Sequence, residues 1–274
     1  MLIYIPSHMR ATEANIRMGP LLQMTKEWQE RTAYVVPCGQ GEEYRQLLQS
    51  QMDIRHVRIE ETPEGLKGIA DTRRWIAEDA RARGEGRLVM MDDDVGFLVR
   101  KGDDDWRLEG QTPEQVSHML GIMDQLLEDH AMVGISSREG NNRSGVGGPV
   151  DENMVAVNTR IMRVFGIDVE KWLAMEHGRV EVMEDFDLTL QLLRAGYSNA
   201  NLFYWANGQR MTNMPGGCST YRSREVQDRS ARRLQELHGD RLVRLRQKTN
   251  KTDAEGLGTR TEVTIMWKKA FGHG

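Results

Sequence analysis

Residues 87–100 read RLVMMDDDVGFLVR, and the fold of the rest of the chain is inferred from this stretch. It begins with a short apolar run, Leu88–Met91, of the kind that a buried parallel strand gives. Three carboxylates follow, Asp92, Asp93 and Asp94, before the apolar pattern resumes. Ligands bind at the carboxyl ends of strands in open α/β sheets, and hard oxygen ligands suit Mg²⁺ or Mn²⁺. We therefore expect a divalent cation at this strand end; the alternative is a solvated acidic turn between two strands.

The chain ahead of the acidic triplet alternates between strand-like and helix-like segments. Apolar or alternating runs predict strands at residues 2–5, 32–36, 54–59 and 88–91, and helical patterns lie between them at 15–31, 42–51 and 69–83. A β-α-β-α-β-α-β order favours a mostly parallel sheet with right-handed crossovers. The sequence therefore predicts an α/β fold whose sheet is flanked by helices.

The second half of the chain is less regular. Thr112-Pro113-Glu114-Gln115 has the residues of a capped helix start, and we expect that helix to run to about residue 130. Residues 136–149 are polar and glycine-rich, as is typical of a functional or mobile loop. Further strands are predicted at 132–135, 154–161, 201–206 and 262–269, with a helix at 188–194.

Bulk composition is that of an ordinary globular protein. The 274 residues include 39% hydrophobic and 28% charged residues, and the net charge is −4. The two cysteines, Cys38 and Cys218, are too few for a disulfide framework and fit a reducing compartment. The first residues do not resemble a signal peptide, and no apolar run is long enough to cross a membrane. We expect a cytoplasmic protein.

A second acidic group lies about ninety residues after the triplet. Glu184, Asp185 and Asp187 open the predicted helix 188–194. Their simplest role is electrostatic, because the N-terminus of a helix favours negative charge. A catalytic role is the other interpretation: a carboxylate that binds a metal is a poor base, so a reaction that needs both a metal and a base needs two acidic groups.

The two acidic groups resemble those of the GT-A (Rossmann-like) fold of nucleotide-sugar glycosyltransferases. Asp92-Asp93-Asp94 resembles the D-x-D element of that fold, and Glu184-Asp185 resembles the "ED" element of inverting family 2 enzymes. This resemblance implies a metal at Asp92 and Asp94, a catalytic base at Asp185 and a catalytic role for Glu184. It also implies a nucleotide-sugar donor site, whose candidate residues are Pro6, Ser7, Arg10, Gly68, Arg73, Asp92 and Asp93.

A narrower resemblance is to the TET/JBP-associated glycosyltransferases of bacteriophages. This resemblance spans most of the chain. It rests on five elements: Tyr4-Ile5-Pro6-Ser7, Gly68-Ile69-Ala70 with Arg73, Asp92-Asp93-Asp94, Glu184-Asp185-Phe186-Asp187 and Gly216-Gly217-Cys218-Ser219. The late Trp267-Lys268-Lys269-Ala270 belongs with them. The resemblance implies Mn²⁺ or Mg²⁺, a UDP-sugar donor and transfer, with inversion, to the hydroxymethyl group of 5-hydroxymethylcytosine in DNA. For a phage protein the compartment is the cytoplasm of the host cell.

Residues 221–248 form a locally basic segment in an acidic protein. Eight arginines and one lysine stand against four acids there. Such a segment can follow the phosphates of a polyanionic acceptor; the alternative is a helix with its own salt bridges. Candidate DNA contacts are Arg138 and Arg143 in the glycine-rich loop, and Arg222, Arg224, Arg232 and Arg233 in the basic segment. We expect a catalytic domain over 1–220 and a basic, helical C-terminal extension over 221–274 that packs on it.

Some residues keep two interpretations. Phe203, Tyr204 and Trp205 can stack a base, although aromatic residues on a strand are more often core residues. His177 and His238 are the histidines that could complete a metal site, and a helix-end role is more ordinary for His238.

Three other classes of protein compete with this interpretation. A phosphatase of the haloacid dehalogenase type needs its nucleophilic Asp after the first strand, where this chain has Pro6-Ser7. A nucleotidyltransferase needs glycines at that point, and residues 6–10 have none. A non-catalytic DNA-binding protein remains as the alternative, as does a glycosyltransferase with a saccharide or other small acceptor.

Overall fold

The computed structural model describes residues 1–102, 105–141, 150–209, 223–249 and 259–272. Within these ranges, ten strands form one sheet in the order β3-β2-β1-β4-β9-β7-β10-β5-β6, with β8 beside β10. Its strands are β1 Leu2–Pro6, β2 Thr32–Val36, β3 Arg58–Glu61, β4 Arg87–Met91, β5 Val95–Gly102, β6 Asp105–Gly110, β7 Met132–Ser137, β8 Val155–Val157, β9 Val164–Asp168 and β10 Asn199–Gln209. The sheet is mixed but mostly parallel, because β5, β8 and β9 run opposite to the others. The predicted α/β class is confirmed.

The first four strands of the sheet form the parallel unit that the sequence predicts. β1 pairs with β2 and β4, and β2 pairs with β3, all in parallel. Side chains alternate between two covered faces: in β4, Val89 and Met91 belong to one core, and Leu88 and Met90 to the other. The third strand begins later than expected, at Arg58, because the apolar residues of 54–57 pack as a loop against the core.

The second half of the sheet contains a strand that sequence patterns did not indicate. β9 lies antiparallel between β4 and β7. The strand predicted at 154–161 is limited to β8, and the chain turns back through residues 158–163 before it enters β9. The hairpin of β5 and β6 pairs antiparallel with β10 and extends the sheet beyond the acidic triplet.

One face of the sheet is covered by the helices α1 Glu13–Met18, α2 Lys26–Glu30, α3 Gly41–Arg45 and α5 Pro113–Leu126, together with a 3-10 turn at Leu21–Gln23 and a π-helical turn at Gln46–Gln51. The single helix predicted over 15–31 is wrong, because Gly19-Pro20 and Thr25 interrupt it. Gly19 is also needed for close packing: a Cβ there would lie 2.6 Å from the carbonyl oxygen of Asp93. The capping box at Thr112 and Gln115 forms as expected, and α5 ends four residues early.

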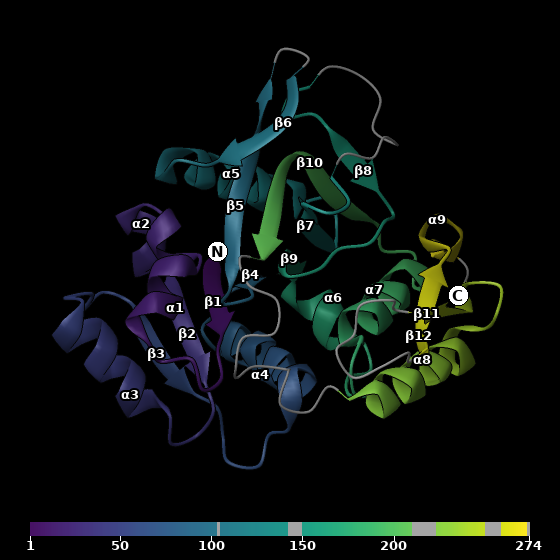
Figure 1. Cartoon of the computed structure of the whole chain (residues 1–274), viewed down its shortest axis with the longest axis horizontal. Helices are drawn as coiled ribbons and strands as arrows, with labels where there is room; N and C mark the ends of the chain where they lie inside the picture. Colours follow the sequence, from purple (N-terminus) through teal and green to yellow (C-terminus); the bar gives the residue numbers. More distant parts are fainter. Residues whose placement is uncertain (103–104, 142–149, 210–222, 250–258, 273–274) are drawn as a thin grey trace.

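The other face carries α4 Gly68–Ala82, α6 Val169–Leu173 and α7 Glu184–Arg194 (Figure 1). α7 has apolar residues on two sides. Leu188 and Leu192 pack toward the sheet, while Leu190 and Leu193 pack away from it. α7 is therefore shared by two hydrophobic cores.

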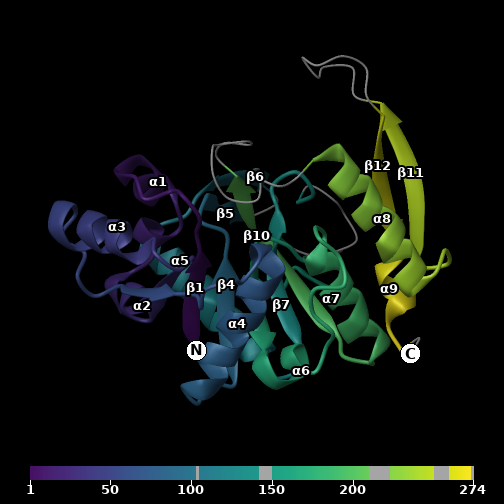
Figure 2. The same ribbon diagram turned by 90° about the horizontal axis from the view of Figure 1, so that it is seen from below.

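The second core of α7 is closed by the C-terminal segment, which is α8 Arg224–His238, the hairpin of β11 Val243–Thr249 and β12 Thr259–Ile265, and α9 Trp267–Ala270. Both views place this segment beside α7, at the end of the molecule opposite α1 and α3 (Figures 1 and 2). The basic segment is thus a helix followed by a strand, and the strand predicted at 262–269 is the end of β12 followed by α9. None of the helices in the described ranges is long and apolar enough to cross a membrane.

Candidate active site

The candidate active site lies at the carboxyl edge of the parallel strands. Asp92, Asp93 and Asp94 follow β4, Ser7 follows β1, and Gln209 ends β10. α7 brings its first residues to the same place, because Arg73 of α4 bonds both Asp92 and Glu184. Acidic residues more than ninety positions apart in the sequence therefore share one site.

Asp93 is held inside the protein. It accepts hydrogen bonds from the Ser7 hydroxyl and from the Arg10 guanidinium, and the Ser7 hydroxyl also lies 2.7 Å from the hydroxyl of Tyr44. Burial raises the pKa of Asp93, and Arg10 and Ser7 oppose that rise. Ser7 and Arg10 were predicted to bind the nucleotide. In this structure their side chains position Asp93, and Pro6 is the buried last residue of β1.

Asp94 and Asp92 lie on either side of this anchored residue. Asp94 keeps 21% of its side chain exposed and accepts bonds from Arg10, at 3.2 Å, and Gln209, at 3.3 Å. Asp92 accepts a bond of 3.0 Å from Arg73. Burial raises the pKa of Asp92 to about 6; Arg73 opposes this, and Asp94, Asp93 and Asp185 add to it. The raised pKa comes first from the loss of water around Asp92 and only then from the neighbouring acids.

Among the described residues, the carboxylates of the site outnumber the arginines that bond them. We call Asp92, Asp93, Asp94, Glu184 and Asp185 the site carboxylates; the arginines that bond them are Arg10 and Arg73. This excess of oxygen ligands fits a divalent cation at Asp92 and Asp94. The described residues offer no group of three or more His, Cys, Asp or Glu side chains that could hold a metal alone. Mg²⁺ in particular is commonly held by one or two carboxylates together with substrate phosphates and water.

Arg73 joins the triplet to α7. Its guanidinium donates to Glu184 Oε1 at 2.5 Å and lies 5.1 Å from the centre of the Phe165 ring. Burial raises the pKa of Glu184 to about 7; Arg73 opposes this, and Asp185 and Asp92 add to it. Arg73 was predicted to contact the donor. Here it neutralises acids on both sides of the site, a role that no local sequence pattern could indicate.

Asp185 is the more accessible of the two acids that were predicted to be catalytic. Glu184 is 7% exposed and bonds Arg73. Asp185 is half-buried, and within the described part of the chain its carboxylate accepts a hydrogen bond only from the backbone N–H of Phe186. The preceding Met183 has a left-handed backbone, with φ of 68°, which turns the chain sharply into α7. This geometry leaves Asp185 able to receive a proton from a substrate.

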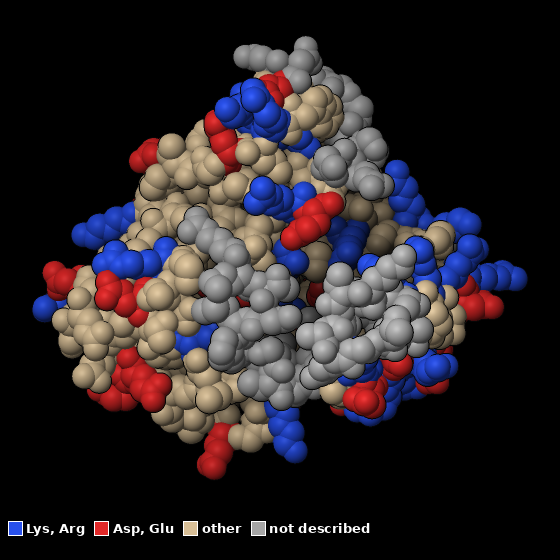
Figure 3. Space-filling view, viewed as in Figure 1, with Lys and Arg blue, Asp and Glu red and all other residues tan. Residues whose placement is uncertain are grey.

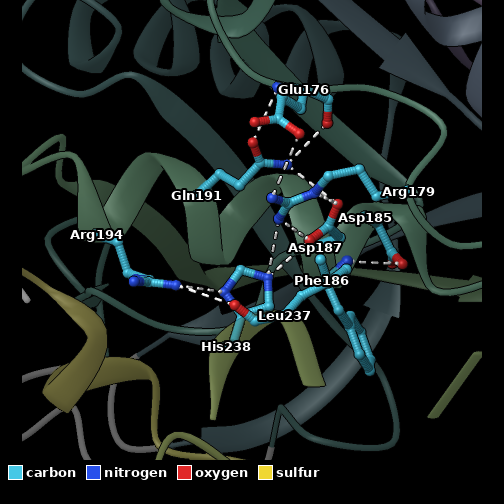
Figure 4. Close-up of polar contacts among 9 residues, drawn as sticks. All are labelled: Glu176, Arg179, Asp185, Phe186, Asp187, Gln191, Arg194, Leu237 and His238. Atoms are coloured by element: carbon cyan, nitrogen blue, oxygen red, sulfur yellow. Dashed lines mark hydrogen bonds and ion pairs between the residues drawn. The ribbon is translucent and has the colours of Figure 1, made fainter. Parts of the chain in front are cut away.

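Asp187 belongs to a different environment, although it lies only two residues further on. It accepts bonds from Arg179 Nε, at 3.0 Å, and His238 Nε2, at 2.7 Å, and is 2% exposed. Figure 4 shows these three side chains converging while Asp185 and the Phe186 ring point away from them. His238 is therefore committed to Asp187. The other histidine that was considered, His177, bonds the Trp172 carbonyl at 3.1 Å.

The remaining donor-site candidate is Gly68, which starts α4 with φ of 72°, a conformation that glycine adopts without strain. Its neighbour Lys67 donates its backbone N–H to the Asp71 carboxylate at 3.0 Å. Three residues that sequence reasoning missed support the site directly: Gly19 against the Asp93 backbone, Tyr44 on Ser7, and Gln209 on Asp94.

The candidate DNA contacts are spread over two surfaces. Arg138 is exposed just after β7, and Arg224, Arg232 and Arg233 are exposed on α8, where Arg233 pairs with Glu236 at 3.2 Å. Arg143 and Arg222, like the predicted loop at 214–218, lie outside the described residues. Figure 3 shows Lys and Arg side chains gathered over the C-terminal segment, and a hollow near the centre of this face. Trp205 is a core residue, as the simpler interpretation held, and Tyr204 packs against the same core.

Known proteins resemble this chain over much of its length. A family model described as TET-Associated Glycosyltransferase matches residues 1–217. The chain is 25% identical over 192 residues to the "Beta-glucosyl-HMC-alpha-glucosyl-transferase" of Enterobacteria phage T6; the match covers 65% of this chain and 64%, less than two thirds, of that relative.

Solved glycosyltransferases show a distant likeness. Glucosyl-3-phosphoglycerate synthase of M. tuberculosis gives a TM-score of 0.48 at 11% identity, covering 86% of this chain and 78% of that one. The mannosyltransferase PcManGT of Pyrobaculum calidifontis, solved with GDP-Man and Mn²⁺, gives 0.47 at 12% identity, covering 72% and 53%. The family match extends over most of the chain and includes the site carboxylates, so the chain belongs to the TET-associated glycosyltransferase family.

Proposed function

We propose that this chain transfers a sugar from a nucleotide-sugar donor, a UDP-sugar, to the hydroxymethyl group of 5-hydroxymethylcytosine in DNA, with inversion at the anomeric carbon. One observation carries the proposal. Arg73 bonds both Asp92 and Glu184, and Asp185 directly follows Glu184 and acts electrostatically on Asp92, so the acids suited to a cation and the acid suited to proton transfer share one site. The phage relative that is named for a hydroxymethylcytosine substrate supports the acceptor.

The donor side of the reaction belongs to the acidic triplet. Asp92 and Asp94 would hold Mn²⁺ or Mg²⁺, which when bound offsets the charge that develops on the leaving diphosphate. Asp93 has little freedom to move, because Ser7 and Arg10 hold it. Its neighbours on either side are therefore fixed by a buried anchor, which limits the reorganisation that substrate binding requires.

The acceptor side belongs to Asp185. Its carboxylate takes the proton of the acceptor hydroxyl while the hydroxyl oxygen attacks the anomeric carbon, and the bond from that carbon to the diphosphate oxygen breaks. The products are a glycosylated base and a nucleoside diphosphate. A base within a duplex must leave the stack to reach such a site, and extrusion of the nucleotide is the usual route.

The test is mass spectrometry of nucleosides from DNA incubated with the protein, Mn²⁺ and a mixture of UDP-sugars. We expect a hexose adduct on 5-hydroxymethylcytosine, none on matched cytosine DNA and none with EDTA. A second DNA with glucosylated hydroxymethylcytosine distinguishes a first from a second sugar transfer. UDP release without any nucleoside adduct would disprove the DNA acceptor, and no turnover with any donor would favour a DNA-binding protein without catalysis.

A further inference from the structure

The segment between β8 and β9, residues 158–163, is held in place by two buried asparagines of β10. The Asn199 amide exchanges two bonds of 2.9 Å with the backbone of Thr159, and the Asn201 amide donates to the Arg160 carbonyl at 3.1 Å. The two asparagines are 2% and 5% exposed. Buried amides that bond a backbone on successive residues fix its position closely. The segment is therefore a rigid support for the side chains that it carries.

The same segment is tied to the acidic triplet. Asn158 and Arg163 bracket it with left-handed backbones, at φ of 52° and 66°. Left-handed residues other than glycine are uncommon and persist where the surroundings require them. The Arg163 carbonyl accepts the backbone N–H of Asp92 at 2.9 Å. Residues 158–163 therefore border the active site although none of them is acidic.

Arg160 points from this segment onto α7. Its guanidinium carbon lies 4.7 Å from the centre of the Phe186 ring, and Phe186 directly follows Asp185. That ring is itself fixed by Trp267 of α9, edge to face, with ring centres 5.6 Å apart and an angle of 83° between the planes. An arginine over an aromatic ring keeps its N–H groups at its rim available for hydrogen bonds. The support on both sides fixes where those donors lie.

Arg160 has no ion-pair partner within the described part of the chain. Its guanidinium forms neither an ion pair nor a hydrogen bond with any described residue, whereas Arg163 beside it pairs with Glu139 at 3.4 Å. The charges that act on Arg160 are those of Asp185, Arg163 and Glu139. Arg160 is exposed to solvent, and partial desolvation lowers the pKa of its guanidinium.

We infer that Arg160 binds a phosphodiester oxygen of the acceptor DNA next to the nucleotide whose base is modified; this rests on the proposed function. A planar guanidinium suits two phosphate oxygens at once. The cations of the donor side, Arg10 and Arg73, bond the site carboxylates directly, whereas Arg160 stands beside Asp185, where the acceptor hydroxyl must arrive. An extruded nucleotide brings its own flanking phosphates to that place.

The experiment measures DNA binding by fluorescence anisotropy, so that it does not depend on turnover. Wild type, Arg160→Gln and Arg160→Lys are compared on a hydroxymethylcytosine duplex and on the same duplex with neutral methylphosphonates at the phosphates that flank the target. Arg55→Gln is the matched control, because Arg55 is exposed and pairs only locally with Asp53 among described residues. Thermal unfolding verifies that each variant is folded.

We expect Arg160→Gln to weaken binding of the natural duplex about tenfold or more and to reduce the salt slope by about 0.9 on duplex DNA. The methylphosphonate duplex should bind wild type more weakly than the natural duplex does, by a similar factor. Arg160→Gln should bind both duplexes with the same affinity, and the loss for Arg160→Lys should lie between those of the other two proteins. Equal losses on the neutral duplex for wild type and Arg160→Gln would overturn the inference. So would weaker UDP-sugar binding with unchanged DNA binding, which would assign Arg160 to the donor.

The outcomes separate the inference from the proposed function. Wild type that binds DNA but forms no nucleoside adduct refutes the proposed transfer and leaves the Arg160 comparison valid. A second outcome is that wild type transfers sugar to DNA while Arg160→Gln has the DNA affinity and the salt dependence of wild type. This outcome refutes only the inference about Arg160. Wild type that does not bind DNA refutes both.

Discussion

The first turn of α7 carries acids in two opposite states. Glu184 faces the triplet, where burial raises its pKa to about 7. Asp187 faces the C-terminal segment, and its pKa is lowered: burial acts to raise it, but His238 and Arg179 outweigh that effect. Among the described residues, Glu184 shares a single arginine with Asp92, while the Asp187 carboxylate accepts hydrogen bonds from the side chains of Arg179, His238 and Gln191. Both acids are buried, so the number of cationic and hydrogen-bonding partners, and not the depth of burial, decides whether the pKa is raised or lowered.

The largest expected effect comes from removing the charge of the accessible acid. Asp185→Asn keeps the shape of the side chain and the start of α7 but cannot accept a proton. Turnover should fall on the order of 10²–10⁴-fold, the usual contribution of a general base. Binding of the UDP-sugar with Mn²⁺, measured by calorimetry, should stay within about twofold. Near-normal turnover by Asp185→Asn would refute its role as the base.

Asp187→Asn tests the other side of the comparison. It leaves the half-buried Arg179 without its carboxylate partner and removes the charged acceptor of the buried His238; the loss of one partner of a buried pair typically costs about 3–5 kcal/mol of stability. Because the folded-state pKa of Asp187 is lowered, its stabilisation is present above the unfolded pKa and disappears as pH falls through the folded value. Urea unfolding should show a large gap to wild type at pH 7 that narrows below about pH 4. A constant gap over that range would mean that charge is not the cause.

Asp94→Ala removes a carboxylate that is accessible and is predicted to hold the metal. We expect donor affinity in Mn²⁺ to fall by about 100-fold, of the size that changes around metal sites produce. Affinity in EDTA should change little, so the two proteins should become similar without metal. Gln209→Ala is the matched control, because it removes the hydrogen-bonding neighbour of Asp94 without removing charge. Equal loss of affinity with and without Mn²⁺ would argue against a metal at Asp94.

Glu184→Gln should have the smallest effect, and its sign is opposite to that of Asp187→Asn. A raised folded-state pKa means that the stability linked to Glu184 is present below its ordinary pKa of 4.5 and is lost as pH rises through about 7. Without metal or donor, Glu184→Gln should therefore be more stable than wild type at pH 8, by roughly 1–3 kcal/mol. The gain should disappear near pH 4. A loss of stability at pH 8 would show that the bond to Arg73 outweighs the cost of burying the charge.

Local patterns were sufficient for most of the parallel unit and for the acids. Leu88–Met91 followed by three aspartates is a strand with a ligand edge, and the capping box at Thr112 is a local hydrogen-bond motif; both were predictable from neighbouring residues. The failures have non-local causes. β9 is short and lies between β4 and β7, so its strand character depends on partners that are distant in sequence.

Side-chain partners were harder to predict than elements. Donor contacts by Arg73 and Arg10 stay a prediction, and the structure shows in addition that both arginines bond acids that come 19 to 111 residues later in the chain. Arg160 carries no sequence motif, and its place beside Phe186 can be found only from the structure. One error in the predicted elements was avoidable from the sequence. Gly19-Pro20 is a local signal for the end of a helix, and α1 ends there.

The sharing of α7 between two cores sets a limit on how this chain can be shortened. A chain cut at residue 220 would keep the whole family match, yet it would uncover Leu190 and Leu193 and take His238 away from Asp187. The last fifth of the polypeptide thus covers one side of α7. A shortened version would need other apolar residues to cover Leu190 and Leu193 in place of the C-terminal segment.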